Sequence, residues 1–364
     1  MLEVLYAVVL VAAVLAGYVL LLRFRVVAAS GSAAGDVCAI IPARNEQNSL
    51  PALLESLDRS TVPVRVLVID DASTDATVAL AREAGVEVIS PGTPAPGWTG
   101  KAWACHVGAN STDAELLLFL DADTVLASGA LGGIVDLHRR FGGLISVQPY
   151  HRVQRTYEQL SAYFNAVAVM ASGVFASGVG RRPMAFGPCL LTSRDDYERA
   201  GGHAAVRGEI LDDVELAAAY EKAGLSVYCV AGGSQIRMRS YPAGIRQLVA
   251  GWTKNMASGA AATDPRAGLA TGLWICAHHL VAVNTLLAMW TADEALDAGI
   301  WLLAWVVFAL QLRVILRRVG SFRWWTWALF PLPLLTFDLL FAISTVNTLR
   351  GSVRWRGRTV RLGA

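Results

Sequence analysis

The sequence predicts an α/β domain with a mostly parallel sheet and with membrane-spanning helices at both ends of the chain. Strand-length apolar runs alternate with helical segments across residues 37–242. The chain is 54% hydrophobic and has a mean hydropathy of +0.45, which is high for a soluble domain. This apolar excess lies at the N-terminus and after about residue 266, so membrane segments flank a soluble middle.

Composition excludes some classes of partner and site. The net charge of +2 gives no sign of nucleic-acid binding. The five cysteines are scattered without a CxxC pair, which favours a reducing compartment and gives no zinc site. The sequence identifies no protein partner.

Residues 1–22 predict a transmembrane anchor, because about 20 apolar residues suffice to cross a bilayer. A cleaved signal peptide is the alternative, but the apolar run is too long and its start lacks Lys and Arg. Arg23 and Arg25 then place the next domain in the cytoplasm. Residues 29–36 are expected to form a flexible linker.

The first half of the soluble domain predicts strands over residues 37–41, 64–69, 86–89 and 116–120, with helices between them. Ser73 or Thr74 is expected to cap the helix after the second strand. Parallel strands bring their carboxyl ends to one edge of a sheet. That edge would gather Pro42–Glu46, Asp70–Asp71 and Asp121–Asp123.

Residues 116–124 are a buried strand that ends in Asp121 and Asp123. Two aspartates at i and i+2 can converge on one divalent cation that also holds phosphate oxygens. The alternative is a strand followed by an Asp-rich turn.

The Gly97–Lys101 loop precedes that strand. Its glycines allow a close approach of the backbone to a ligand, and Lys101 could meet a diphosphate. The spacing is too short for a P-loop, and the alternative is a surface loop before a helix.

The second half of the domain predicts a strand over 144–150, a helix over 153–177, a turn and strand over 185–192 and a short helix over 194–200. Asp212 and Asp213 begin a further helix. They either cap this helix and complement its dipole or provide a general base for the acceptor.

The C-terminal third predicts membrane association. Residues 243–265 read as an amphipathic helix at the membrane surface, with a buried soluble helix as the alternative. Membrane segments follow over 266–349, as two or three spans. Arginines in the loop 317–324 indicate a cytoplasmic side, but four spans would put the basic tail, 350–364, outside. A re-entrant hairpin over 325–347, which contains Pro331, Pro333 and Asp338, would resolve the conflict.

Four motifs, in this order and spacing, resemble family 2 glycosyltransferases with the Rossmann-like GT-A fold. They are Ile41–Glu46, Asp70–Asp75, Asp121–Asp123 and Asp212–Leu216. A closer resemblance, over nearly the whole chain, is to the bacterial 4,4'-diaponeurosporenoate glycosyltransferase group of carotenoid synthesis. It is carried by Gly97–Lys101, Ser146–His151, Ala185–Pro188, Gly201–His203, Gly251–Asn255 and Val353–Arg358.

The resemblance implies a membrane-bound, inverting hexosyltransferase. The donor would be a UDP-sugar, with glucose as the expected sugar, and the cofactor a divalent metal, Mg²⁺ or Mn²⁺. The acceptor would be lipid-like, a carotenoid or terpenoid carboxylate or hydroxyl. The enzyme would be a multi-pass protein of the cell (inner) membrane, with its catalytic domain in the cytoplasm.

The resemblance also implies roles for single residues. Asp71 would pair with the uracil, beside Asp70, and Asp123 with Asp121 would hold the metal and the diphosphate. Asp213, supported by Asp212, would be the base. The nucleotide would be lined by Pro42, Ala43, Asn45 and Glu46. Lys101 as a diphosphate contact is inferred from its charge and loop. The acceptor and membrane side would hold His203, Trp252 and Lys254.

Two departures from the family pattern matter. Asp212 replaces the usual Glu, which leaves open which of the pair is the base. The Q-x-x-R-W motif of processive members is absent, because Gly251 precedes Trp252, so a single transfer is expected. The alternatives are a polyprenyl-phosphate, hopanoid or sphingolipid-type glycosyltransferase, and a degenerate GT-A domain that serves as a membrane scaffold.

Overall fold

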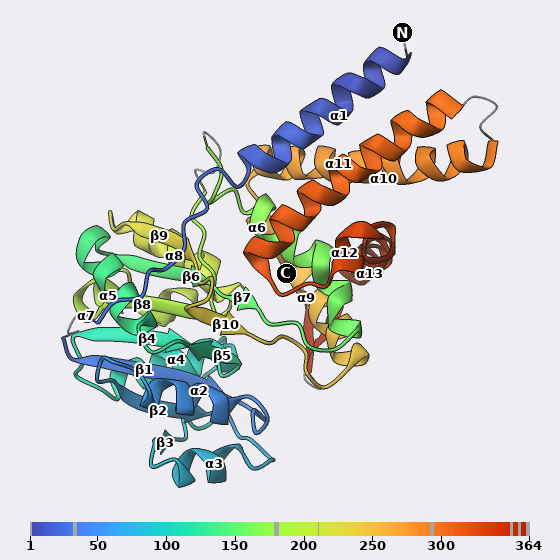
Figure 1. Ribbon diagram of the computed structural model, residues 1–364. Helices are drawn as coiled ribbons and strands as arrows, with labels where there is room; N and C mark the ends of the chain where they lie inside the picture. The colour runs from blue at the N-terminus through green and yellow to red at the C-terminus, as the bar shows by residue number, and fades with distance from the viewer. Residues whose placement is uncertain are drawn as a thin grey trace. The chain divides into compact units, whose positions relative to one another are not determined.

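The computed structural model describes residues 2–31, 35–177, 182–209, 211–291, 295–349, 352–355 and 358–361 (Figure 1). The chain divides into two compact units. An α/β unit contains Arg25–Tyr150 and Arg182–Arg239. A mainly helical unit contains Met1–Phe24, His151–Arg181 and Ser240–Ala364.

The α/β unit is built on a seven-stranded sheet of order β3-β2-β1-β4-β8-β6-β9. Its strands are β1 (Val37–Ala43), β2 (Arg65–Asp70), β3 (Glu87–Ile89), β4 (Leu116–Leu120), β6 (Leu144–Gln148), β8 (Cys189–Ser193) and β9 (Val227–Ala231). All neighbours are parallel except β8, which runs antiparallel to β4 and β6. The predicted mostly parallel sheet is therefore confirmed.

Shorter elements complete this unit. Strand β5 (Thr124–Leu126) follows directly after Asp121–Asp123 and pairs antiparallel with β10 (Ile236–Met238). The helices are α2 (Leu50–Asp58), α3 (Thr77–Glu83), α4 (Gly100–Asn110), α5 (Ala130–Phe141), α7 (Arg194–Arg199), the 3₁₀ helix η2 (Gly202–Val206) and α8 (Asp212–Lys222). Strand β7 (Tyr150–His151) lies where the chain passes from one unit to the other.

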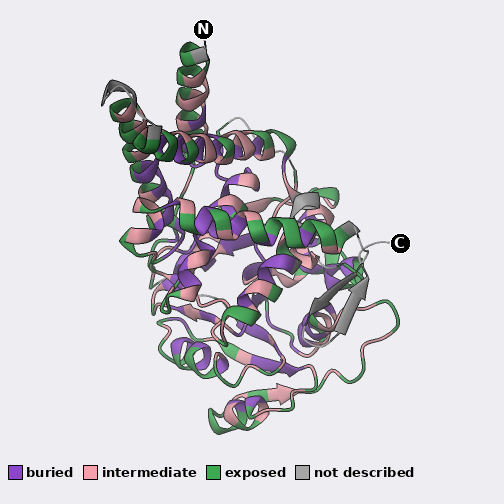
Figure 2. Cartoon of the chain, turned by 90° about the vertical axis from the view of Figure 1, so that its right-hand side faces the viewer, coloured by how far each residue is buried: buried purple, intermediate pink, exposed green. Residues whose placement is uncertain are grey.

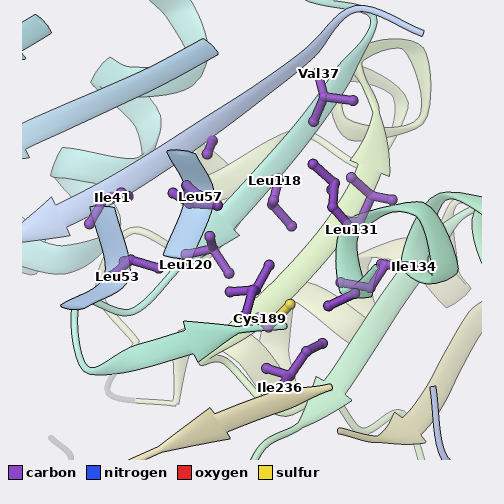
Figure 3. Close-up of a cluster of buried hydrophobic side chains, with 14 of the residues drawn as sticks. Val37, Ile41, Leu53, Leu57, Leu118, Leu120, Leu131, Ile134, Cys189 and Ile236 are labelled. Atoms are coloured by element: carbon purple, nitrogen blue, oxygen red, sulfur yellow. The ribbon is translucent and has the colours of Figure 1, made fainter. Parts of the chain in front are cut away.

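Strand β4 divides its side chains between two hydrophobic cores. Leu118 and Leu120 join α2 and α5 on one face of the sheet, where Leu53, Leu57, Leu131 and Ile134 pack (Figure 3). Leu117 and Phe119 join the opposite core, with residues of α4, α7 and α8. Both faces are covered, which explains the uninterrupted apolar run Leu116–Leu120. Each buried leucine stabilises the fold by about 2 kcal/mol.

The segment before β1, part of which was predicted to be a flexible linker, is hydrogen-bonded to the rest of the α/β unit. The Val27 amide donates to Ala231 O at 2.9 Å, and the Ser30 amide donates to Gly129 O at 3.0 Å. Residues 27–30 thus run along the ends of β9 and α5. Residues 32–34 of the predicted linker lie outside the described residues.

The helical unit contains α1 (Leu2–Val19), the 3₁₀ helix η1 (Tyr157–Ser161), α6 (Ala162–Ala171), α9 (Ile245–Ala262), α10 (Pro265–Thr291), α11 (Ala295–Val319), α12 (Trp324–Ala328), α13 (Pro331–Leu349) and a hairpin of β11 (Ser352–Trp355) and β12 (Arg358–Arg361). Three helices have a length and composition that allow them to cross a membrane, within Pro265–Trp290, Ala298–Val319 and Pro331–Thr348. Helix α1 is also apolar but shorter. Many of their large apolar residues are exposed, and exposed residues of the chain are coloured green in the cartoon of Figure 2.

Buried Gln311 links three of these helices. Its amide nitrogen donates to Val14 O of α1, at 2.6 Å, and its amide oxygen accepts from the Trp274 indole of α10, at 2.9 Å. Side-chain amides are effective contacts between apolar helices because little else there satisfies a polar group.

The structure bears on two predictions for the C-terminal third, the re-entrant hairpin and the amphipathic helix. The described residues within 325–347 form no re-entrant hairpin. They belong to α12 and to the continuous helix α13. Pro331 and Pro333 occupy the first turn of α13, where amides lack helical partners, so they begin the helix instead of breaking it. In α9, Leu248 and Trp252 are buried and Ile245 is exposed. The interfacial position of α9 remains a prediction.

Candidate functional site

One pocket of the α/β unit is lined by six of the fourteen sequence-predicted residues. It lies at the carboxyl ends of β1 and β4, beside the beginnings of α4 and α8. Its lining is Pro42, Lys101, Cys105, Phe119, Leu120, Asp121, Gly187, Leu190, His203, Asp212 and Asp213. The predicted sheet edge therefore brings together residues that are up to 171 positions apart, from 42 to 213.

Loops after β1 and β2 hold one another at this edge. Asn45 adopts a left-handed backbone (φ 55°), and its side-chain oxygen accepts from the Thr74 amide at 2.8 Å. The Asn45 amide donates to Ser73 Oγ at 2.9 Å. Ser73 and Thr74 are thus engaged with the first loop, and the expected capping of α3 was wrong, because Ala76 holds the cap position.

Asp70 and Asp71 have different surroundings. Asp70 is buried and accepts from the Ser73 amide at 3.3 Å, so it stabilises the turn after β2. Asp71 is partly exposed and pairs with Arg44 at 3.1 Å. The Asp71 amide also donates to Ala43 O at 2.9 Å. Of the two carboxylates, Asp71 is the more available to a ligand.

Lys101 and Asp121 form an ion pair, with Nζ 2.7 Å from Oδ1. Thr99 positions the lysine, because its hydroxyl accepts from the Ala102 amide and caps α4. Burial lowers the pKa of Lys101, but the carboxylates of Asp121 and Asp212 outweigh it and raise the pKa well above its usual value. Lys101 is therefore a permanent positive charge in an acidic pocket.

Asp123 lies in an environment that favours a cation. Burial raises its pKa, and the charges of Asp121 and Glu46 add to this effect. A divalent cation would relieve this repulsion, and carboxylate oxygens suit Mg²⁺ or Mn²⁺. Among the described residues, no three His, Cys, Asp or Glu side chains form a full ligand set. A cation held by Asp121 and Asp123 would need further oxygens from a ligand and water.

Asp213 lines the pocket and is held there by a backbone amide. Its Oδ2 accepts from the Gly187 amide at 2.8 Å, and burial with the nearby charge of Asp212 raises its pKa to about 6. The residue at the cap position of α8 is Leu211, without a side-chain cap bond. Neither aspartate therefore caps α8, but both lie in its first turn, where their charges complement the helix dipole as the alternative reading expects.

The predicted acceptor residues fall in both units. His203 lines the pocket beside Lys101 and Asp121. Trp252 belongs to the helical unit, where it stacks on Phe164 at 4.8 Å and its indole donates to Ser161 Oγ at 3.2 Å. Lys254 is part of α9, but its side chain lies outside the described residues.

Sequence reasoning missed five lining residues. Four carry no charge or motif of their own, because they are core or pocket-wall side chains: Cys105, Phe119, Leu120 and Leu190. Gly187 was part of a recognised motif, Ala185–Pro188, but received no role. Its amide bond to Asp213 is a tertiary contact across 26 positions, which no local pattern encodes.

Known proteins resemble the chain in sequence and in fold. A family model described as "Glycosyl transferase family 2" matches residues 38–198. A 4,4'-diaponeurosporenoate glycosyltransferase of Staphylococcus aureus strain MRSA252 is 35% identical over 326 residues, which cover 88% of this chain and 86% of the relative. The protein of the same name from strain bovine RF122 / ET3-1 is also 35% identical, with the same coverage.

A solved structure resembles the chain along almost its whole length. It is a mannosyltransferase from Pyrobaculum calidifontis in complex with GDP-Man and Mn²⁺. The TM-score is 0.55 at 18% identity, and the match covers 96% of both chains. The likeness is one of fold.

Proposed function

Because the chain belongs to glycosyl transferase family 2 and is a hexosyltransferase-type enzyme, we propose that it transfers glucose from UDP-glucose to a lipid-like carboxylic acid within a membrane. The observation that carries the proposal is the gathering of Lys101, Asp121 and the Asp212–Asp213 pair in one pocket. The relatives' names support a carotenoid acid as acceptor.

The donor would occupy the sheet edge. Pro42 and Ala43, at the end of β1, and Asn45 and Glu46, in the loop after it, would line the nucleotide. Asp71 would lie at the uracil, and Asp70 would stabilise the turn after β2. Lys101 would neutralise the diphosphate, because its charge persists at any working pH.

Asp121 and Asp123 would hold a divalent metal together with the diphosphate. When bound, the metal would stabilise the negative charge that develops on the leaving UDP. Mn²⁺ in the mannosyltransferase neighbour is consistent with this assignment.

Asp213 would act as the general base. An acceptor oxygen attacks the anomeric carbon on the face opposite UDP, the bond from that carbon to the diphosphate oxygen breaks, and the configuration inverts. A carboxylic acid in a bilayer keeps its proton, because a low dielectric disfavours the charged form. Asp213, with its pKa raised to about 6, is suited to take that proton near neutral pH. Asp212 would support it through charge.

Membrane topology is part of the proposal. Helices α10, α11 and α13 would span the cell (inner) membrane and α1 would anchor the N-terminus. The α/β unit would face the cytoplasm, as the positive-inside rule predicts from Arg23, Arg25 and the arginines of the loop 317–324. Exposed leucines and valines along these helices would face lipid.

The test is transfer by the purified full-length protein in lipid nanodiscs. With UDP-glucose, Mn²⁺ and a C30 carotenoid acid, we expect UDP release and a glucosyl ester with the mass of acid plus hexose minus water. Polyprenyl phosphate, hopanoid and ceramide serve as alternative acceptors in parallel reactions. Product with one of these alone would overturn the carotenoid assignment, and no UDP release with any acceptor would overturn the donor.

A further inference from the structure

His203 has a fixed orientation at the wall of the pocket. Its side chain is 3% exposed and lies on η2. The ring meets the edge of Phe119, with centroids 4.8 Å apart, and lines the same pocket as Lys101 and Asp121. None of the roles proposed above for the donor includes it.

Tyr197 determines which nitrogen of His203 carries the proton. The tyrosine hydroxyl accepts from the His203 backbone amide at 3.0 Å, and it lies 2.9 Å from Nδ1. The hydroxyl proton is then the one available to Nδ1, which makes Nδ1 an acceptor. In a neutral imidazole the ring proton must therefore be on Nε2.

The motif Gly201–His203 makes this contact possible. Gly202 has a left-handed backbone (φ 51°), and a Cβ at this position would lie 2.5 Å from carbons of the Tyr197 ring. Only glycine allows the chain to fold so closely over the tyrosine. We interpret the motif Gly201–His203 as the feature that orients the His203 ring toward the pocket.

The imidazole is also kept neutral. Burial lowers the pKa of His203 to about 3, and the positive charge of Lys101 adds to this effect. In the described part of the chain, no group is hydrogen-bonded to Nε2. Among the described side chains that line the pocket, Lys101 is thus the one cation and His203 the one uncharged N–H donor.

We propose that His203 donates a hydrogen bond from Nε2 to a hydroxyl oxygen of the sugar that is transferred, and that it is a specificity-determining residue of the donor site. The inference rests on the proposed function, because it takes a UDP-sugar as the ligand. A sugar hydroxyl is uncharged and is matched by a neutral donor, whereas Lys101 provides the charge that phosphates require. Hydroxyl recognition by a buried donor discriminates strongly between sugars.

Two substitutions separate this role from a merely structural one. In His203→Gln the side-chain amide reaches the position of Nε2 and can still donate into the pocket. In His203→Asn the shorter amide reaches the position of Nδ1, so it keeps the contact with Tyr197 and loses the donor. Binding of UDP and of UDP-glucose, each with Mn²⁺, is measured for the full-length protein in nanodiscs by titration calorimetry.

We expect His203→Asn to weaken UDP-glucose binding about tenfold, the effect of one hydrogen bond, and to leave UDP binding within about twofold. His203→Gln should bind UDP-glucose within about threefold of wild type. A structural role predicts the reverse order, with Asn better tolerated than Gln, and would overturn the inference. Equal losses for UDP and UDP-glucose would also overturn it, because they would indicate a phosphate contact.

An unchanged UDP-glucose affinity in His203→Asn, with a raised KM for the acceptor, would assign His203 to the acceptor and overturn the inference while the proposed function stands. Wild-type protein that binds neither UDP nor UDP-glucose would overturn the proposed donor, and the inference with it. The two failures are therefore distinguishable.

Discussion

Gly187 and Asp213 are joined by a backbone-to-carboxylate hydrogen bond of 2.8 Å, although 26 residues separate them. Gly187 comes just before β8, and Asp213 lies in the first turn of α8. A Cβ on residue 187 would lie 3.0 Å from Asp213 Oδ2 and 3.3 Å from its Cγ. Asp213 can therefore take this position only because residue 187 is a glycine, which has no side chain.

Gly187→Ala should lower kcat by about tenfold or more while the protein stays folded, because a carboxylate displaced by a few tenths of an ångström loses its alignment. Steady-state kinetics with a thermal-unfolding control would measure this. A matched control is Gly31→Ala, at an exposed position without a left-handed backbone, where no atom lies within 4 Å of the new Cβ. Wild-type kcat in Gly187→Ala would contradict the proposed restraint.

The pH dependence of turnover should report the ionisation of Asp213. Its raised pKa, about 6, means that the carboxylate is protonated below this pH and cannot accept a proton. We therefore expect kcat to fall as the pH is lowered through about 6 and to level off above pH 7.

The same ionisation should make the stability of the fold decrease with rising pH, whereas turnover increases. A carboxyl group whose folded pKa is raised from the unfolded value of 3.8 binds protons more tightly in the native state. Its contribution to the free energy of unfolding therefore falls as the pH rises from about 4 to 6.

Asp213→Asn should reduce kcat by about 10²–10⁴-fold and remove the pH dependence of both turnover and stability that this carboxyl group causes. Asp212→Asn is the comparison, and a larger loss there would transfer the base assignment to Asp212.

Metal removal should abolish transfer. EDTA treatment should stop UDP release, and added Mn²⁺ or Mg²⁺ should restore it. Asp123→Asn should remove the metal dependence of UDP binding, because one of the two proposed carboxylate ligands is lost. Calorimetry with UDP, with and without Mn²⁺, measures this without requiring turnover. Unaltered activity in EDTA would contradict the metal assignment.

Shortening a buried side chain of β4 should lower the free energy of unfolding more than a substitution in the loops does. Leu118 is fully buried between α2 and α5. Leu118→Ala should lower the free energy of unfolding by about 2–5 kcal/mol, from lost burial and an unfilled cavity. Chemical denaturation measures this, and Leu22→Ala, at a 63% exposed position, provides a contrast with an expected change within about 0.5 kcal/mol.

The first half of the sheet was readable from sequence because its signals are local. Strands β1, β2 and β4 are uninterrupted apolar runs that end in polar loops, and parallel pairing then fixes a shared edge. Pro42, in β1, and Asp121, directly after β4, lie together in the pocket for this reason.

The rest of the fold and of the site could not be predicted from the sequence, because it is determined by tertiary contacts. The antiparallel direction of β8 is invisible in its composition, because buried strands of either direction have the same pattern. No element had been assigned to α5, β5, β9 or β10. Ser73 and Thr74 look like helix caps, but Asn45 engages both. The role of Tyr197 emerges only when Gly202 folds over it.

The two-sided burial of β4 also limits how this gene can vary. Insertion or deletion of one residue between Leu116 and Leu120 would exchange the side chains of the two cores, since strand positions alternate. The same slip would rotate Phe119 away from His203 and shift Asp121 away from the Pro188 carbonyl, to which its amide donates at 3.0 Å. Diverged copies of this gene should therefore differ here by exchange of one apolar residue for another and keep the same number of codons.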